Sequence, residues 1–179
     1  MQSLPPDSRL IKSIVICGGT HGNETNGIML ARHFDFLLKS NPFPSDPLWK
    51  DYQSIESIKV VYSNPNAIER NVRYVNEDLN RCFLQDDLCK YNPNNTFSLS
   101  DKERTYERKR AHELNNILGP KGSLESTDLI IDLHTTTSNT KINMIMSPTD
   151  EVNSDLFSLT FSKYSLSSLK PPNSNLFLF

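Results

Sequence analysis

The sequence predicts an α/β fold in which a mostly parallel or mixed central sheet is flanked by helices. Short apolar runs rich in β-branched residues recur along the chain, and segments with apolar residues at helical spacing lie between them. Histidines stand at or just beyond the ends of two of these apolar runs. The length of 179 residues is sufficient for one domain with its own core.

The first half of the chain has the pattern strand, helix, strand. Residues 12–17 are apolar and β-branched, and residues 28–38 carry apolar side chains at helical spacing until the prolines of residues 41–44 end that helix. A second strand is expected over residues 55–62. Residues 66–81 are dense in polar side chains, so we expect them to be irregular.

A further helix is expected after a loop rich in Asn and Asp at residues 85–98. Ser100 and Glu103 have the spacing of a capping box, and Gly119 with the following proline stops the helix. Its apolar stripe is formed by Ala111, Leu114, Ile117 and Leu118. Its charged residues are expected to form a solvated face; they are Arg104, Glu107, Arg108 and Lys109.

The last third of the chain begins with a buried strand at residues 128–133. Residues 142–146 are expected to form a neighbouring strand, and residues 151–166 are weakly helical. Residues 175–179 resemble the beginning of a strand. Because domains usually end in exposed polar residues, this apolar end predicts that the sequence is part of a longer protein.

Composition limits the partners. A net charge of −2 and a pI near 6.1 provide no basic field for nucleic acid, so a small-molecule partner is expected. No apolar stretch is long enough to span a bilayer and the first residues lack a signal peptide, which predicts a cytoplasmic protein without membrane contact. The three cysteines show no C-x-x-C spacing, so no disulfide framework is expected.

Two histidines and a glutamate form the strongest chemical pattern. His21 and Glu24 are three residues apart just after the first strand, and His134 ends the strand at residues 128–133. Parallel strands bring their carboxyl ends to one edge of a sheet, so these side chains are expected to converge. Three ligands from His and Glu are typical of catalytic zinc sites, which predicts a hydrolytic zinc centre. The alternatives are a solvated turn for His21 and Glu24 and a hydrogen-bonded core histidine for His134.

Residues 64–81 contain three arginines and several amides. Since the guanidinium fork donates two parallel hydrogen bonds to a carboxylate, this segment predicts an acidic substrate. The alternative is that the arginines are surface partners of Glu69, Glu77 and Asp78.

Three motifs in order resemble the aspartoacylase/succinylglutamate desuccinylase family. They are Gly-Gly-Thr-His-Gly-Asn-Glu at 18–24, Asp-Leu-Asn-Arg at 78–81, and Asp-Leu-His at 132–134 with the threonines, serine and asparagine that follow. The resemblance extends from about residue 11 to about residue 178. It implies a zinc-carboxypeptidase-like fold and hydrolysis of the amide of an N-acyl amino acid, such as N-acetyl-L-aspartate. Related substrates within the family are N-acyl aromatic amino acids and succinyl amino acids.

The resemblance also implies roles for individual residues. His21, Glu24 and His134 are the implied ligands of one zinc ion, and Arg73 is implied to polarise the scissile carbonyl. The implied substrate-binding residues are Asn80, Arg81 and Asn64. Asp132 and Asp78 are implied to contact the residues of the site rather than the zinc ion. Asp132 is expected to orient an imidazole, which fixes its tautomer and basicity. Asp78 is expected to position the loop of Arg81 or to have a plain structural role.

The family pattern includes features without a counterpart here. These are a glutamate general base, a further substrate-binding arginine and a smaller C-terminal β domain, and Thr135 stands where asparagine is usual. We therefore expect residues 1–179 to be the N-terminal portion of a single zinc-hydrolase domain, incomplete at its C-terminal end and lacking the proton-transfer group. The alternative is a short non-catalytic protein that binds metal or associates with relatives or itself through an exposed strand edge.

Overall fold

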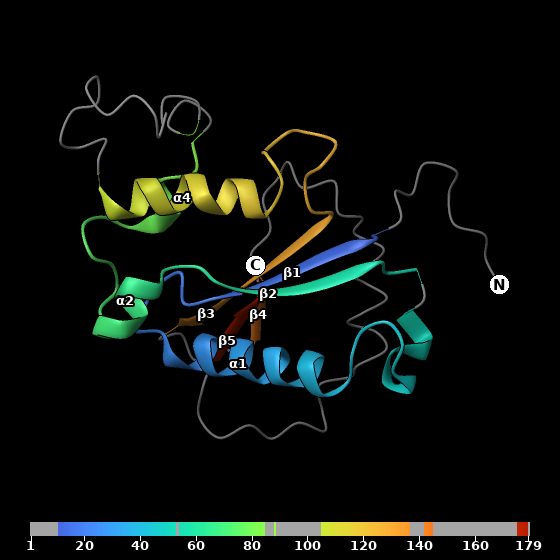
Figure 1. Ribbon diagram of the computed structural model, residues 1–179. Coiled ribbons are helices and arrows are strands. Elements are labelled where there is room, and N and C mark those ends of the chain that lie inside the picture. Colours follow the sequence, from blue (N-terminus) through green and yellow to red (C-terminus); the bar gives the residue numbers. More distant parts are fainter. Residues whose placement is uncertain are drawn as a thin grey trace.

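The central sheet is mixed and combines near and distant parts of the chain. The computed structural model describes residues 11–52, 54–84, 88, 105–136, 142–144 and 175–178. Within these ranges the strands are β1 (Ser13–Gly18), β2 (Ser57–Tyr62), β3 (Leu129–Thr136), β4 (Ile142–Met144) and β5 (Asn175–Leu178). Their order in the sheet is β2-β1-β3-β5-β4 (Figure 1).

Strand direction divides the sheet into two parts. β1 pairs in parallel with both β2 and β3, whereas β5 is antiparallel to β3 and parallel to β4. The expectation that residues 142–146 lie next to the His134 strand is wrong, because β5 occupies that edge and pairs Leu133 with Leu178. A pairing between residues so far apart in sequence leaves no local signal.

Helices cover both faces of the sheet, as predicted. α1 (Thr25–Ser40) packs on one face and α4 (Tyr106–Ile117) on the other (Figure 1). Ile16, Ala31 and Leu133 form the core under α1, and Leu79, Cys82, Leu88, Ala111 and Leu114 form the core under α4. The mixed sheet flanked by helices confirms the α/β fold class.

Two segments differ from the sequence prediction. Residues 66–81 are not all irregular, because α2 (Pro65–Arg70) and the 3₁₀-helix η2 (Leu79–Arg81) lie within them. Asn64 caps α2 by accepting a hydrogen bond from the Ala67 backbone N–H, and proline suits the first helical position. A second short 3₁₀-helix, η1 (Pro47–Tyr52), follows α1.

The start of α4 also differs from the prediction. The helix begins at Tyr106, and the Thr105 hydroxyl accepts from the backbone N–H of Arg108, so Thr105 rather than Ser100 is its cap. Gly119 follows the helix with a φ of +82°, a left-handed conformation that suits glycine and ends the helix as predicted. The expected loop at residues 85–98, apart from Leu88, and the expected helix at 151–166 lie outside the described residues.

Small residues let α1 approach the carboxyl ends of β1 and β3. A Cβ added at Gly27 would lie 2.2 Å from the carbonyl oxygen of Leu133, and one added at Gly18 would lie 2.6 Å from the Ala31 Cβ. The first turn of α1 therefore sits directly against the sheet. This contact brings Glu24, the residue before α1, to the end of β3.

Candidate metal centre

His21, Glu24 and His134 converge at the carboxyl ends of β1 and β3. The Nδ1 atom of His21 lies 2.7 Å from Oε1 of Glu24, and the Nδ1 atom of His134 lies 2.9 Å from Oε2 of the same carboxylate. The two imidazole rings meet edge to face with centroids 4.9 Å apart. Both histidines are buried, and one potential ligand atom from each of the three residues lies within 4.8 Å of the others.

Each imidazole is held on its other side by a second carboxylate. Nε2 of His21 lies 3.0 Å from Oδ1 of Asp78, and Nε2 of His134 lies 2.8 Å from Oδ2 of Asp132. The Thr20 hydroxyl lies 2.8 Å from both oxygens of Asp132 and donates to that carboxylate. Both Nδ1 atoms face Glu24, and carboxylates at Nε2 would favour the Nε2–H tautomer once a metal ion occupies Nδ1.

The charges in this cluster are strongly coupled. Burial alone would raise the pKa of Glu24, but hydrogen bonds from His134, His21 and the Thr135 backbone outweigh it and hold this pKa far below its usual range. Burial would also lower the pKa of His134, yet hydrogen bonds to Asp132 and Glu24 raise that pKa to about 9. The cluster therefore keeps its carboxylate ionised and attracts a positive charge.

Burial and hydrogen bonding also have opposite effects on the pKa of Asp78. Burial alone would raise the pKa of Asp78, but hydrogen bonds with His21 and with the Asn80 backbone N–H lower it. An ionised carboxylate behind an imidazole raises its basicity as a ligand. Asp78 and Asp132 thus have equivalent positions, one behind each histidine.

The donor set suits a divalent metal ion. Two imidazole nitrogens and one carboxylate are the kind of three-residue set that catalytic zinc sites use. Each imidazole also forms a hydrogen bond through its other ring nitrogen. The backbone N–H of Thr135 donates to Oε2 of Glu24 at 2.8 Å and so holds the carboxylate in place. The hydroxyl of Thr135 is buried without a hydrogen-bond partner among the described residues. These residues could hold a metal ion, as the sequence predicted.

Arg73 reaches the same carboxylates from the loop after α2. Its Nη1 lies 3.4 Å from Oε1 of Glu24 and its Nη2 lies 3.2 Å from Oδ2 of Asp78. Its carbonyl oxygen accepts a hydrogen bond of 3.2 Å from the backbone N–H of Gly22. The half-exposed guanidinium therefore faces both the cluster and solvent, where it can interact with a bound molecule.

Asn80 and Arg81 lie on η2, directly after Asp78. The Asp78 side chain caps η2 by accepting from the Asn80 backbone N–H at 3.0 Å. Both side chains are exposed, and Arg81 donates to the Asn80 carbonyl at 3.3 Å. The structure thus places these residues next to the cluster through Asp78, and their contact with substrate stays a prediction.

Asn64 is completely buried. Besides capping α2, its side-chain amide donates to Oε1 of Glu107 at 3.2 Å. These contacts give Asn64 a role in the interior, and its predicted part in binding substrate is not tested by them.

Glu107 was expected on a solvated face, and this expectation is wrong. Its exposed fraction is 0%, and it accepts hydrogen bonds from the loop that carries Arg73 and Asp78. The signal was present in the sequence, because Glu107 precedes Ala111 by four residues and so shares the buried stripe of the helix. Of the other charges, Arg108 pairs with Glu77 while Lys109 is exposed.

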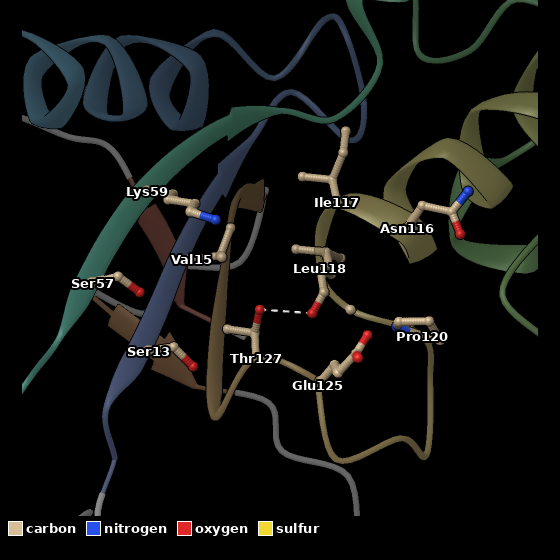
Figure 2. A pocket seen from close by; sticks show the side chains of 11 residues that line it. Ser13, Val15, Ser57, Lys59, Asn116, Ile117, Leu118, Pro120, Glu125 and Thr127 are labelled. Carbon is tan, nitrogen blue, oxygen red and sulfur yellow. Dashed lines mark hydrogen bonds between the residues drawn. The ribbon is translucent and has the colours of Figure 1, made fainter.

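A pocket of about 250 Å³ lies elsewhere, between the starts of β1 and β2 and the end of α4 (Figure 2). Two of its lining residues are joined by a hydrogen bond, which Thr127 donates to the Leu118 carbonyl at 2.7 Å (Figure 2). None of its lining residues belongs to the cluster of His21, Glu24 and His134. Volume alone therefore does not mark the chemical centre of this protein.

Among the described residues, no helix has the length and apolar character needed to cross a bilayer. Cys17 and Cys82 are both buried, and neither forms a disulfide among the described residues.

Comparison with known proteins identifies relatives along most of the chain. The sequence is 38% identical over 151 residues to the N-acyl-aromatic-L-amino acid amidohydrolase (carboxylate-forming) B of Danio rerio, covering 84% of this chain and 42% of that protein. It is also 38% identical over 161 residues to the aspartoacylase of Xenopus tropicalis, covering 90% of this chain and 44% of that protein. The chain thus spans less than half the length of these two relatives.

A solved structure shows the same fold. Murine aminoacylase 3 superposes with a TM-score of 0.64 at 28% sequence identity, over 96% of this chain and 56% of that chain. A family model described as the succinylglutamate desuccinylase/aspartoacylase catalytic domain matches residues 10–160. The chain therefore belongs to the succinylglutamate desuccinylase/aspartoacylase family.

Proposed function

We propose that this protein is a zinc-dependent hydrolase that cleaves the amide bond of N-acyl amino acids. The convergence of the two Nδ1 atoms of His21 and His134 on the Glu24 carboxylate carries the proposal. Membership of a family whose relatives are named as amidohydrolases supports it. Because the chain spans less than half the length of those relatives, hydrolysis and its substrate are proposals for the whole protein.

The three converging residues would hold one zinc ion. Zinc in such a site supplies Lewis acidity, which polarises a carbonyl and lowers the pKa of water toward about 7. Asp78 and Asp132 would keep the two imidazoles in the ligating tautomer. Glu24 would remain ionised, because its low pKa excludes protonation at neutral pH.

Arg73 is proposed to act on the carbonyl oxygen of the substrate. Its half-exposed guanidinium lies at Glu24 and Asp78, so a carbonyl bound beside Glu24 would come within its reach. A fixed donor of this kind stabilises the developing oxyanion, and its loss typically costs about 100-fold or more in turnover.

Asn80 and Arg81 are proposed to bind the α-carboxylate of the substrate. Both are exposed and follow Asp78 by two and three residues, and a guanidinium can form two parallel hydrogen bonds with a carboxylate. Asn64 is proposed to support this region from the interior through α2 and Glu107.

N-acetyl-L-aspartate is the proposed substrate, hydrolysed to acetate and L-aspartate. The arginines of the loop favour an acidic molecule, while N-acyl aromatic and succinyl amino acids are the alternatives. The relatives compared above include both an aspartoacylase and an N-acyl-aromatic-L-amino acid amidohydrolase at the same identity, so identity does not choose between the substrates. A cytoplasmic location and self-association stay predictions.

A hydrolysis assay tests the proposal. The whole protein is purified, stripped with a chelator, reloaded with zinc and incubated with N-acetyl-L-aspartate, N-acetyl-L-phenylalanine and N-succinyl-L-glutamate. We expect zinc-dependent release of aspartate from N-acetyl-L-aspartate. The His21→Ala variant should lose this activity. The His33→Ala control, at an exposed histidine of α1, should retain it. Preference for the aromatic substrate would reject the aspartate assignment. Zinc binding without turnover of any substrate would reject the hydrolase and leave a non-catalytic metal-binding protein.

A further inference from the structure

Glu107 is a buried carboxylate in the first turn of α4. Most of the groups that donate hydrogen bonds to it belong to one loop. Its Oε1 accepts from the backbone N–H of Val75 at 2.7 Å, and its Oε2 accepts from those of Asn76 at 3.0 Å and Glu77 at 3.4 Å. The side-chain amide of Asn64 donates to Oε1 at 3.2 Å. Four donors therefore saturate one carboxylate that has no contact with solvent.

The rest of this helix start holds the same segment. The backbone N–H of Tyr106 donates to Oδ1 of Asn76 at 3.0 Å, and the Thr105 hydroxyl donates to the Glu77 carboxylate. Arg108 completes the contact with two hydrogen bonds to Glu77, of 2.9 and 3.2 Å. Residues 75–77 are thus fixed to α4 by both their backbone and their side chains.

This segment lies between two residues of the metal centre. Arg73 is two residues before Val75, and Asp78 immediately follows Glu77. Arg73 contacts Glu24 and Asp78, and Asp78 contacts Nε2 of His21. A shift of residues 75–77 by one ångström would therefore move the carboxylate behind His21 and the guanidinium beside Glu24 together.

Both ends of the loop are tied to Glu107. Asn64 lies before α2 and caps it, whereas Val75 and Asn76 lie after it. One buried carboxylate thus joins the beginning and the end of the segment that contains α2 and Arg73. The donors that satisfy this buried carboxylate come from two separate stretches of loop, so the carboxylate also connects those stretches.

We propose that Glu107 is a positioning residue that holds residues 75–77 so that Asp78 and Arg73 reach His21 and Glu24. The inference rests on the metal centre of the proposed function, but it concerns the geometry of that centre and not turnover. Glu107 does not touch the cluster itself; it acts through the backbone of the loop.

Hydrogen exchange of the unchanged chain gives the first test, which requires no variant to fold. If Glu107 ties the segment to α4, the amides of Val75, Asn76 and Glu77 exchange in the same opening event as the amides of α4, with equal protection. Exchange of these three amides about 100-fold faster than those of α4 would overturn the proposal, because the segment would then open independently.

A matched pair of variants gives the second test. Glu107→Gln keeps the side-chain size but replaces one acceptor oxygen with an NH₂ group that opposes the backbone donors, whereas Glu113→Gln changes a partly exposed carboxylate on the same helix. Co²⁺ is the probe, since its visible spectrum reports the geometry around the metal. We expect Glu107→Gln to bind Co²⁺ about tenfold more weakly with shifted bands, and Glu113→Gln to match the unchanged chain.

The outcomes separate this inference from the proposed function. A folded Glu107→Gln with unchanged Co²⁺ affinity, unchanged bands and unchanged exchange at residues 75–77 would overturn the positioning role. Failure of the unchanged chain to bind Co²⁺ would instead overturn the metal centre and the role of Glu107 in positioning residues around a metal ion. Hydrogen exchange would still decide whether Glu107 holds residues 75–77.

Discussion

Glu24 and His134 are 110 residues apart in the sequence, yet Oε2 of Glu24 lies 2.9 Å from Nδ1 of His134. Two features of the fold produce this contact. The parallel pairing of β1 with β3 brings their carboxyl ends together, and Gly27 lets the first turn of α1 touch the Leu133 backbone. The metal centre therefore depends on packing between α1 and β3 as much as on its own side chains.

The stability of the metal-free protein is predicted to fall between about pH 6.5 and 9. The pKa of His134 is raised from 6.5 to about 9 because Asp132 and Glu24 outweigh the effect of burial. Its contribution is fully present below pH 6.5 and is lost as pH rises through the folded value, a loss on the order of 1–3 kcal/mol. Urea unfolding of chelator-treated protein at several pH values measures it, with His134→Gln as the comparison. The same pH dependence in both proteins would contradict this assignment.

Removal of the charge behind His134 is predicted to weaken metal binding. Asp132→Asn leaves a side chain of the same shape but loses the ionised partner of Nε2, so zinc affinity should fall about 10- to 100-fold. Asp35→Asn, which removes a surface partner of Lys39 on α1, should leave zinc affinity unchanged. Competition with a chromophoric chelator measures both. Equal affinities in the two variants would mean that Asp132 does not tune the centre.

Gly27→Ala is predicted to destabilise the fold although alanine favours helices. Helix propensity alone would stabilise the protein by about 1 kcal/mol. However, the added Cβ would lie 2.2 Å from the Leu133 carbonyl oxygen, so α1 must move away from β3 at a cost of about 1–3 kcal/mol. Met29→Ala, at an exposed position of the same helix, should change stability by less than about 0.5 kcal/mol. Chemical denaturation decides, and a more stable Gly27→Ala would contradict the close contact.

The Cys17 thiol is predicted to be unreactive at neutral pH in the folded protein. Burial, together with the negative charge of Asp132, raises its pKa to about 12, and only the thiolate reacts quickly with iodoacetamide. Labelling at pH 8 should therefore be at least about 100-fold slower in the folded protein than in urea. Mass spectrometry of the peptide that contains Cys17 provides the measurement. Rapid labelling without urea would show that the end of β1 is open to solvent.

The parts of the fold that could be predicted are those with a local signal. Residues 12–17 and 28–38 correspond to β1 and α1, and the histidine and glutamate motifs correspond to a cluster with converging ligand atoms. Convergence followed from one rule, that parallel strands end at one edge. The resemblance to the family is shown by the family match over residues 10–160.

The parts that were missed depend on distant partners. The insertion of β5 between β3 and β4 depends on a pairing of residues 133–136 with 175–178, for which no local pattern exists. Glu107 was assigned to solvent because charged side chains are usually exposed, but its acceptors are used by backbone N–H groups of a loop 30 to 32 residues earlier. The spacing of Glu107 from Ala111 and Leu114 nevertheless puts it on the buried stripe of the helix.

Zinc titration of the chelator-treated chain by calorimetry shows whether His21, Glu24 and His134 form a metal site. We expect one equivalent of zinc per chain, with affinity that rises up to about tenfold per pH unit below pH 9 because binding displaces the His134 proton. Replacement of His21, Glu24 or His134 by alanine should abolish this binding, while His33→Ala should leave it intact. Absence of stoichiometric binding, or binding that survives all three replacements, would show that these residues do not form a zinc site.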